Sequence, residues 1–338
     1  MKKTIYIIGI GGRTGSMFAR ELQEASNIVG VGMKDEISRI AAGGVTVERS
    51  AAAPEILKVE TVAVEDFAAA TVHKFPDFVL FAVKNPVTEA VKSYYGYFRG
   101  EGRFPALILF QNGLSAINDA KTGLAEALGS DADRVRIIRM SLINGVDAEI
   151  GDGTFRAIYK LPIRLGFGAV GNQSAADIKE ILVDAGIECE EFKGKGVFEM
   201  ENSKLFTNLI GMAAAVDGVG VEAGLRDRKI FRREAAMLRE YVLAIKAAGS
   251  GFSDSFCGYP IKFLAGLMLL PVWLLLPFRG LLARIVARGR NRPKDLGEVD
   301  YYNGEVVKLG KRFGVAVGEN EKILADAKEL LVQLSKLR

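Results

Sequence analysis

Residues 4–16 read Thr4-Ile5-Tyr6-Ile7-Ile8-Gly9-Ile10-Gly11-Gly12-Arg13-Thr14-Gly15-Ser16, and this stretch decides the fold. Ile5–Ile8 is a short apolar run that ends at Gly9, and helical character follows over Met17–Leu22. This order predicts a buried strand, a glycine turn and a helix. A signal peptide fits less well, because the run is short and no small-residue cleavage site follows it.

The glycines of this turn have separable tasks. Gly9 allows a tight turn, Gly11 or Gly12 lets the backbone approach a pyrophosphate, and Gly15 lets the helix pack close to the strand. Because Thr14 interrupts the G-x-G-x-x-G spacing, the turn fits G-x-x-G-x-x-G instead. With a strand before it and a helix after it, the turn predicts dinucleotide binding at the helix N-terminus. The alternative is a plain structural turn.

The end of the second expected strand, Ile28–Met33, bears on the choice of cofactor. An acid there favours a ribose 2′-hydroxyl, whereas a base favours a 2′-phosphate. The chain offers both signs, because Lys34 and Asp35 follow the strand. Lys34, together with Arg13 in the glycine turn, favours NADPH; the alternative is that Lys34 is a solvated loop residue.

Strands and helices alternate through the first half of the chain, which predicts an α/β fold with a Rossmann-type, doubly wound parallel sheet. Further strands are expected at Phe78–Val83, Leu107–Phe110, Val135–Ile138, Ile158–Phe167 and Glu188–Phe192. Helices are expected at Ile37–Ala42, Val87–Tyr97, Thr122–Leu128 and Ala175–Ala185.

After about Gly196 the helical period takes over, which predicts an all-α C-terminal domain. We therefore expect an NADP-binding Rossmann domain over residues 1–195 and a helical substrate and dimerisation domain over 196–338. The expected helices are Phe198–Ala215, Lys229–Ala248, Ile261–Arg288, Asp300–Phe313 and Glu319–Leu337.

Composition narrows the function classes. The 338 residues are 49% hydrophobic with a net charge of +4, so nucleic-acid binding has no support from composition. Cys189 and Cys257 lie far apart, which predicts no metal site and a reducing, cytoplasmic compartment. His73 is the single histidine, which makes a serine–histidine pair or a histidine metal cluster a poor interpretation.

Three segments carry side chains suited to chemistry. Lys84 follows a buried strand, and Asn112 follows the next one, so both are expected at the strand ends where α/β sheets bind ligands. Lys204 and Asn208 lie four residues apart and share one helix face.

Together these motifs resemble the ketopantoate reductase (2-dehydropantoate 2-reductase) family, whose fold is 6-phosphogluconate-dehydrogenase-like. The family pattern runs in order through the glycine turn, Val83-Lys84, Gln111-Asn112-Gly113, Lys204-Leu205-Phe206-Thr207-Asn208 and Glu298-Val299-Asp300-Tyr301-Tyr302-Asn303-Gly304. Each motif is modest alone, but five in order across nearly the whole chain are specific.

The resemblance implies NADPH-dependent reduction of 2-dehydropantoate to pantoate, a step of pantothenate biosynthesis, by a homodimeric enzyme. Lys204 would stabilise the developing oxyanion and donate the proton. Asn208 would orient that lysine or the substrate, and Glu298 would bind the substrate hydroxyl or pair with Lys204. Lys84 and Asn112 would hold the nicotinamide-ribose end. The alternative for Lys204 is an ordinary exposed helix lysine, and for Glu298 an exposed acid.

Several positions depart from the family pattern. A frequent tryptophan is replaced by Asn202, a second asparagine by Met212, a Ser-rich stretch by residues 290–295, and Pro-x-Asn by Gly318-Glu319-Asn320. Because such positions line the family's pocket, another small 2-oxo or 2-hydroxy acid is the second candidate substrate. A catalytically silent NADP(H)-binding or sensing protein, possibly at a membrane, is the third interpretation.

An uncharged run, residues 263–278, contains Pro271, Trp273 and Pro277, and arginines follow it at 279, 284, 288, 290 and 292. A single membrane span would separate Lys204 from Glu298 if both serve one site. We therefore expect a buried or dimer-interface helix, with peripheral contact to a membrane surface as the next interpretation.

Overall fold

The computed structural model describes residues 2–49, 53–151, 154–171, 173–254, 258–287 and 293–336. Cys257, Arg288, Arg290 and Arg292, which the sequence singles out, lie outside these ranges. The chain divides into two compact units. The first comprises Met1–Gln111 and Ala116–Val197, and the second comprises Asn112–Ser115 and Phe198–Arg338.

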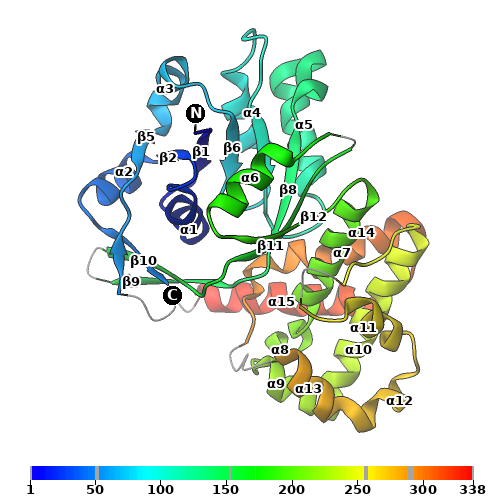
Figure 1. Ribbon diagram of the computed structural model, residues 1–338. Coiled ribbons are helices and arrows are strands. Elements are labelled where there is room, and N and C mark those ends of the chain that lie inside the picture. The colour runs from blue at the N-terminus through cyan, green and yellow to red at the C-terminus, as the bar shows by residue number, and fades with distance from the viewer. Residues whose placement is uncertain are drawn as a thin grey trace. The chain divides into compact units, whose positions relative to one another are not determined.

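The first unit alternates strands and helices (Figure 1). Its strands are β1 (Thr4–Ile8), β2 (Asn27–Gly32), β3 (Val45–Arg49), β4 (Glu55–Ile56), β5 (Glu60–Ala63), β6 (Phe78–Phe81), β7 (Ala106–Leu109), β8 (Ile137–Leu142), β9 (Val146–Gly151), β10 (Thr154–Tyr159), β11 (Arg164–Ala169) and β12 (Glu188–Glu191). Its α-helices are α1 (Arg13–Leu22), α2 (Lys34–Ala41), α3 (Phe67–His73), α4 (Thr88–Gly96), α5 (Ala116–Leu128) and α6 (Ala176–Asp184), with short 3-10 turns at Val64–Asp66 and Gly129–Arg134.

Eight strands form the main sheet in the order β12-β11-β8-β7-β6-β1-β2-β5. All neighbours pair in parallel except β8 and β11, which are antiparallel. The chain reverses its crossover direction at β1, between β2 and β6, as a doubly wound sheet requires. The predicted α/β, Rossmann-type class is confirmed, with one antiparallel pairing added.

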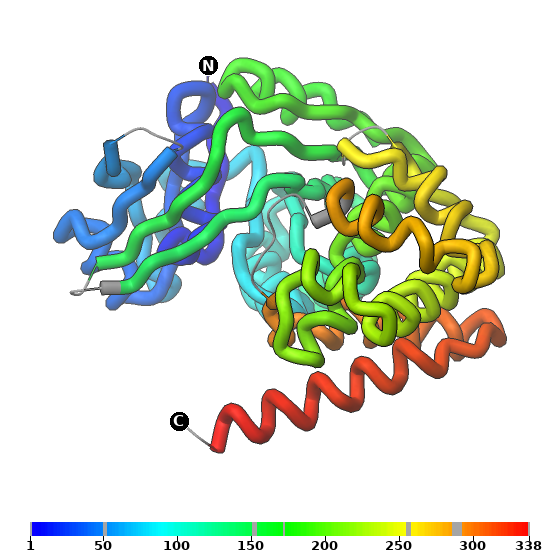
Figure 2. The backbone as a smooth tube through the Cα atoms, turned by 90° about the horizontal axis from the view of Figure 1, so that it is seen from below, coloured from blue at the N-terminus to red at the C-terminus, as the bar shows by residue number. Residues whose placement is uncertain are grey.

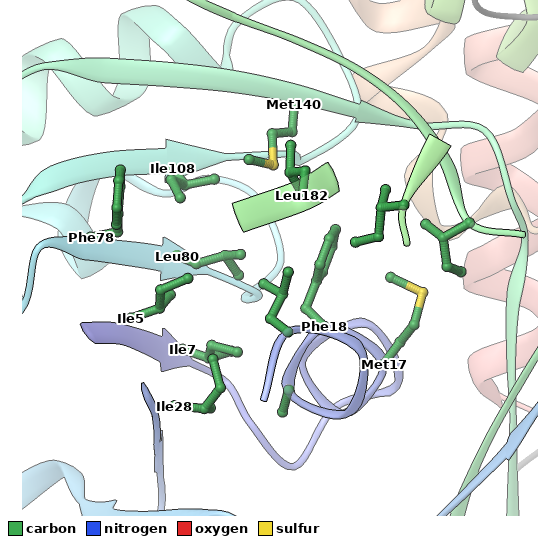
Figure 3. Packing of buried hydrophobic residues seen from close by; sticks show 14 of the residues in the cluster. Ile5, Ile7, Met17, Phe18, Ile28, Phe78, Leu80, Ile108, Met140 and Leu182 are labelled. Atoms are coloured by element: carbon green, nitrogen blue, oxygen red, sulfur yellow. The ribbon is translucent and has the colours of Figure 1, made fainter. Parts of the chain in front are cut away.

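The central strands β1, β6 and β7 are buried along their whole length, so both faces of the sheet are covered there, with alternate residues pointing to opposite sides. On β1, Ile5 and Ile7 pack with Phe18 of α1, and Figure 3 shows these side chains together with Leu80 and Ile108 of the neighbouring strands. The intervening β1 residues join a second cluster that includes side chains of α3, α4 and α5. Such burial, roughly 1.5–3 kcal/mol for each large side chain, explains why the central strands read as continuous apolar runs.

A second sheet, with the order β4-β3-β10-β9, was not predicted. Its strands are short or alternate apolar with polar residues, so their sequence signal is weak. The single strand expected over Ile158–Phe167 is wrong, because β10 ends at Tyr159 and β11 begins at Arg164. Asn144 holds the turn between them: its Nδ2 donates to the carbonyls of Lys160 and Pro162, at 2.9 and 3.0 Å.

The second unit is helical apart from its loops (Figure 1). It contains most of α7 (Lys195–Leu209), followed by α8 (Met212–Val216), α9 (Val221–Arg226), α10 (Arg228–Ala247), α11 (Ile261–Met268), α12 (Val272–Leu275), α13 (Arg279–Ala287), α14 (Asn303–Phe313) and α15 (Gly318–Lys336), with 3-10 turns at Leu276–Phe278 and Leu296–Tyr301. Figure 2 shows α15 (red) as one long uninterrupted helix.

Two of the predicted helices are broken in the structure. The helix expected over Phe198–Ala215 is interrupted at Gly211, whose φ of +94° is left-handed and whose Cβ would stand 2.6 Å from the side chain of Val221. The helix expected over Ile261–Arg288 divides into α11, α12 and α13, and Pro271 begins the first break. Within the described residues, no helix combines the length and the apolar character that a membrane crossing requires.

Glu234 of α10 is a fully buried carboxylate that serves the break at Gly211. It accepts hydrogen bonds from the backbone N–H groups of Gly211 and Ala213, the second at 3.2 Å. Burial raises the pKa of Glu234 to about 7, although these hydrogen bonds and the charge of Lys294 act in the opposite direction.

This shift predicts a pH dependence of stability. The folded state binds the proton more tightly than the unfolded state, so Glu234 lowers the free energy of unfolding as the pH rises from about 4.5 to about 7. The free energy of unfolding is expected to fall by roughly 2–4 kcal/mol over this pH range. Urea unfolding at pH 5 and pH 8 should show a smaller pH-dependent loss for Glu234→Gln than for the parent. An identical loss in both proteins would contradict the assignment.

Candidate functional site

The glycine turn of the first unit has the geometry of a tight strand-to-helix connection. Gly9 has a left-handed φ of +86°, and its N–H donates to the Val31 carbonyl at 2.9 Å. A Cβ on Gly15 would lie 2.2 Å from the Gly9 carbonyl oxygen, so only glycine allows α1 to start this close to the turn. These are the local tasks that the sequence analysis gave to Gly9 and Gly15.

The N-terminus of α1 could hold a phosphate. Gly12 is the N-cap residue, no side chain caps the helix, and its first turn contains no acid. A Cβ on Gly12 would meet only the Gly9 oxygen within 4 Å, at 3.4 Å, so the space beside it is open. Unsatisfied N–H groups and the helix dipole favour an anion at such a terminus. Arg13, which is exposed, and Thr14 begin the helix there.

The carboxyl end of β2 presents two charges of opposite sign. Lys34 is the exposed first residue of α2. Glu36 lies closer to the glycine turn: a Cβ on Gly11 would stand 3.0 Å from its side chain. Its Oε2 also accepts the Met33 N–H at 3.0 Å, which fixes the carboxylate at the end of the strand. The sequence analysis did not single out Glu36; its place as the third helical residue after a strand was the available signal.

The ends of β6 and β7 are joined by a buried amide. Gln111 Nε2 donates to the carbonyls of Phe81 and Val83, at 2.6 and 3.2 Å. Its Oε1 is buried and has no hydrogen-bond partner among the described residues. Lys84, the residue directly after Val83, is exposed. An unsatisfied buried oxygen at the ligand-binding edge of the sheet fits an amide or hydroxyl donor of a ligand.

In the second unit, the polar residues Asn112, Asn208 and Glu298 contact one another although they lie far apart in the sequence. Asn112 Nδ2 donates to Glu298 Oε2 at 2.7 Å, and Asn208 Nδ2 donates to Asn112 Oδ1 at 3.2 Å. Tyr302 completes the group, because its hydroxyl donates to Glu298 Oε2 and accepts from Asn112 Nδ2 at 3.2 Å. All four residues belong to the same compact unit.

Local structure explains how these side chains meet. Asn208 lies in the last turn of α7, and Glu298 lies in the 3-10 turn that ends at Tyr301. Gly113 has a φ of +93°, and a Cβ there would stand 3.0 Å from the Tyr301 carbonyl oxygen. The glycine after Asn112 is therefore required for the close approach of the two segments.

Two lysines border this polar group. Lys204 is half-buried, one helical turn before Asn208 on α7. Lys294 Nζ donates to the carbonyls of Asn208 and Thr207, the second at 3.2 Å, and lies 5.9 Å from the centre of the Tyr302 ring. Lys294 therefore neutralises the C-terminal end of α7 beside the amide of Asn208. This role was not predicted, because Lys294 lies within a basic run and in no recognised motif.

Two departures from the family pattern have structural roles. Asn202 is buried, and its Nδ2 donates to Ser250 Oγ and to the Gly251 carbonyl at 2.9 and 2.8 Å. Met212 is fully buried at the start of α8. Asn202 thus holds the loop after α10, and with these two residues in place Asn112 still contacts both Asn208 and Glu298.

Comparisons with known proteins bear on the fold. No protein-family model matches the sequence, and a sequence search of curated proteins finds no match. Among solved structures, a ketopantoate reductase from Ralstonia eutropha has a TM-score of 0.72 at 18% identity, covering 99% of this chain and 100% of its own. 2-Dehydropantoate 2-reductase from Methylococcus capsulatus has a TM-score of 0.68 at 16% identity, covering 98% and 97%.

A D-mandelate dehydrogenase, solved with NADH and anilino(oxo)acetate, has a TM-score of 0.69 at 14% identity and covers 96% of this chain and 97% of its own. At these identities the likeness establishes the fold. It is the fold that the family resemblance predicts from the sequence motifs.

Proposed function

We propose that this protein reduces a small 2-oxo acid to the 2-hydroxy acid with a nicotinamide dinucleotide. The observation that carries the proposal is the contact between Asn112, Asn208 and Glu298, three residues that the family pattern assigns to one site. The glycine turn and the uncapped N-terminus of α1 support the nucleotide part. Gln111 is the last residue of the first segment of the first unit, and the next residue, Asn112, begins the second unit.

The residues present fit the chemistry of carbonyl reduction. A bound nicotinamide supplies a hydride to the carbonyl carbon, and negative charge grows on the carbonyl oxygen. In the proposal the Lys204 ammonium stabilises that oxygen and transfers a proton to it. Asn208 orients the reacting groups through the hydrogen bond that it donates to Asn112. Glu298 Oε2 is engaged by Asn112 and Tyr302, so its other oxygen is the one that would accept a substrate hydroxyl.

For the substrate we propose 2-dehydropantoate, the compound that the motif order favours. It carries a 2-oxo acid group and a hydroxyl that would donate a hydrogen bond to Glu298. A panel of 2-oxo acids assayed for nucleotide oxidation tests this choice. The highest kcat/KM is expected for 2-dehydropantoate. A preference for another 2-oxo acid would shift the assignment to a related reductase, and no turnover with any of them would favour a silent nucleotide-binding protein.

For the nucleotide we propose NADPH, with Lys34 binding the 2′-phosphate. NADH is a second candidate, because the carboxylate of Glu36 is fixed beside Gly11 and would accept a hydrogen bond from a ribose 2′-hydroxyl. A carboxylate at that place also repels a 2′-phosphate.

Glu36→Gln tests the effect of the carboxylate separately from that of Lys34. We expect this isosteric change to raise the ratio of kcat/KM for NADPH to that for NADH by about ten-fold, since it removes one charge near the ribose. Lys34→Ala, the matched change of the opposite sign, should lower the same ratio. Steady-state kinetics with both nucleotides measures it. If neither variant alters this ratio, the adenosine ribose does not bind beside Glu36 and Lys34.

A further inference from the structure

The apolar stretch from α11 to α13 does not bury its largest side chains. Phe263, Trp273 and Phe278 are 63%, 66% and 59% exposed, and Leu270 and Leu281 are also exposed. Their neighbours in sequence face inward: Ile261, Leu264, Met268, Leu275, Leu276 and Leu282 are buried. The expectation of a buried helix is therefore met by one side of this stretch and not by the other. Figure 1 shows α12 at the corner where the chain turns from α11 towards α13.

The exposed residues follow a helical spacing. On α11 the exposed Phe263 and Gly266 lie three residues apart beside the exposed Lys262, and on α13 the exposed Leu281 and Ile285 lie four residues apart. Arg284 is exposed next to Ile285, so the outward sides of the two helices combine apolar with basic residues. Single exposed apolar residues are common on protein surfaces, but three exposed aromatic rings within residues 263–278 are not. We call residues 261–287, which run through α11, α12 and α13, the apolar hairpin.

The charged residues of the apolar hairpin are all basic and flank its uncharged run at residues 263–278. It contains Lys262, Arg279 and Arg284 and no acidic residue, and in the sequence four more basic residues precede the next acid, Asp295. Arg279 donates to the Arg226 carbonyl, and exposed Arg228 and Lys229 begin α10 nearby in sequence. Three acids near this segment have partners: Glu222 pairs with Arg226, Asp227 caps α10, and Asp254 accepts the backbone N–H of Lys262 at 2.6 Å.

We propose that the apolar hairpin docks on an anionic lipid surface without crossing it. Aromatic and aliphatic side chains would enter the boundary between headgroups and acyl chains, and the basic residues would contact the headgroup charges. The charge favours lipid over a second copy of this chain, because two identical basic hairpins would repel each other. The proposal does not depend on the proposed reaction.

Trp273 is the only tryptophan of the chain, so the hairpin carries its own probe. We expect its emission to shift to shorter wavelength when vesicles of phosphatidylcholine mixed with phosphatidylserine are added to the full-length protein. Pure phosphatidylcholine vesicles should give a much smaller shift, and high salt should reduce the shift on the anionic vesicles.

Cosedimentation with the same vesicles measures the affinity. Phe263→Ser and Phe278→Ser should each weaken binding roughly ten-fold or more, since each removes an exposed ring from the buried interface. Leu334→Ser, an exposed apolar residue on α15, is the matched control and should bind like the parent. Circular dichroism and thermal unfolding check that the variants remain folded.

Three results would overturn the proposal. One is a Trp273 emission that does not respond to anionic vesicles. Another is equal binding to neutral and anionic vesicles. The third is a blue-shifted emission that depends on protein concentration without vesicles, together with a dimer in sedimentation velocity that Phe278→Ser disrupts, because that result would make the hairpin a subunit interface.

Discussion

Replacing Lys204 by alanine is expected to lower kcat for 2-oxo acid reduction by about 10²–10⁴-fold, because the reaction would lose both its proton donor and the positive charge beside the developing oxyanion. Lys204 lies on α7 one turn before Asn208, and Asn208 contacts Asn112 within the polar group. Stopped-flow and steady-state measurements of nucleotide oxidation give the rate, and nucleotide titration should give an almost unchanged Kd.

Lys195→Ala is the matched control, since Lys195 is an exposed lysine at the start of the same helix. It should retain the parent rate. If both variants keep the parent kcat, Lys204 is an ordinary surface lysine and the proposed proton donor is wrong. If Lys204→Ala instead unfolds the protein, Lys204→Met, which keeps the aliphatic stem, provides the same test.

Gly15→Ala is expected to destabilise the first unit by about 3 kcal/mol or more, because its Cβ would lie 2.2 Å from the Gly9 carbonyl oxygen and the backbone must move. Nucleotide binding should be lost with it. Urea unfolding and nucleotide titration measure the two effects separately.

Gly12→Ala tests nucleotide binding with little effect on stability. Its Cβ meets only the Gly9 oxygen, at 3.4 Å, and its φ of −86° suits alanine, so stability should fall by less than about 1 kcal/mol. Affinity for the dinucleotide should nevertheless fall at least about ten-fold, because a methyl group would stand where the phosphates approach the backbone. Unchanged affinity in a folded Gly12→Ala protein would mean that the turn is only structural.

The central strands of the main sheet were predictable because they are buried on both faces and read as apolar runs, whereas the half-exposed edge strand β5 was not predicted. The residues of β1 and β6 illustrate this, as each is almost fully buried. The second sheet was not, because β3 and β10 mix buried with half-exposed residues and pair across more than a hundred positions. Local periodicity carries no information about such a pairing.

The candidate site was also predictable only in part. Motif order was sufficient to select Asn112, Asn208 and Glu298, which the fold brings into contact. Tyr302 and Lys294 complete their surroundings through a hydroxyl and an ammonium whose partners are set by tertiary structure. Glu36 illustrates the limit most clearly: its charge was visible in the sequence, but only the folded turn places it against Gly11.

The central claim is that a hydride passes from a nicotinamide dinucleotide to the C2 carbon of a 2-oxo acid on this protein. The most direct measurement uses NADPH or NADH dideuterated at C4 with 2-dehydropantoate and examines the product by mass spectrometry. We expect a 2-hydroxy acid that carries one deuterium at C2, and we expect Lys204→Ala to form it far more slowly. A product without deuterium, or no product from any 2-oxo acid with either nucleotide, would contradict it.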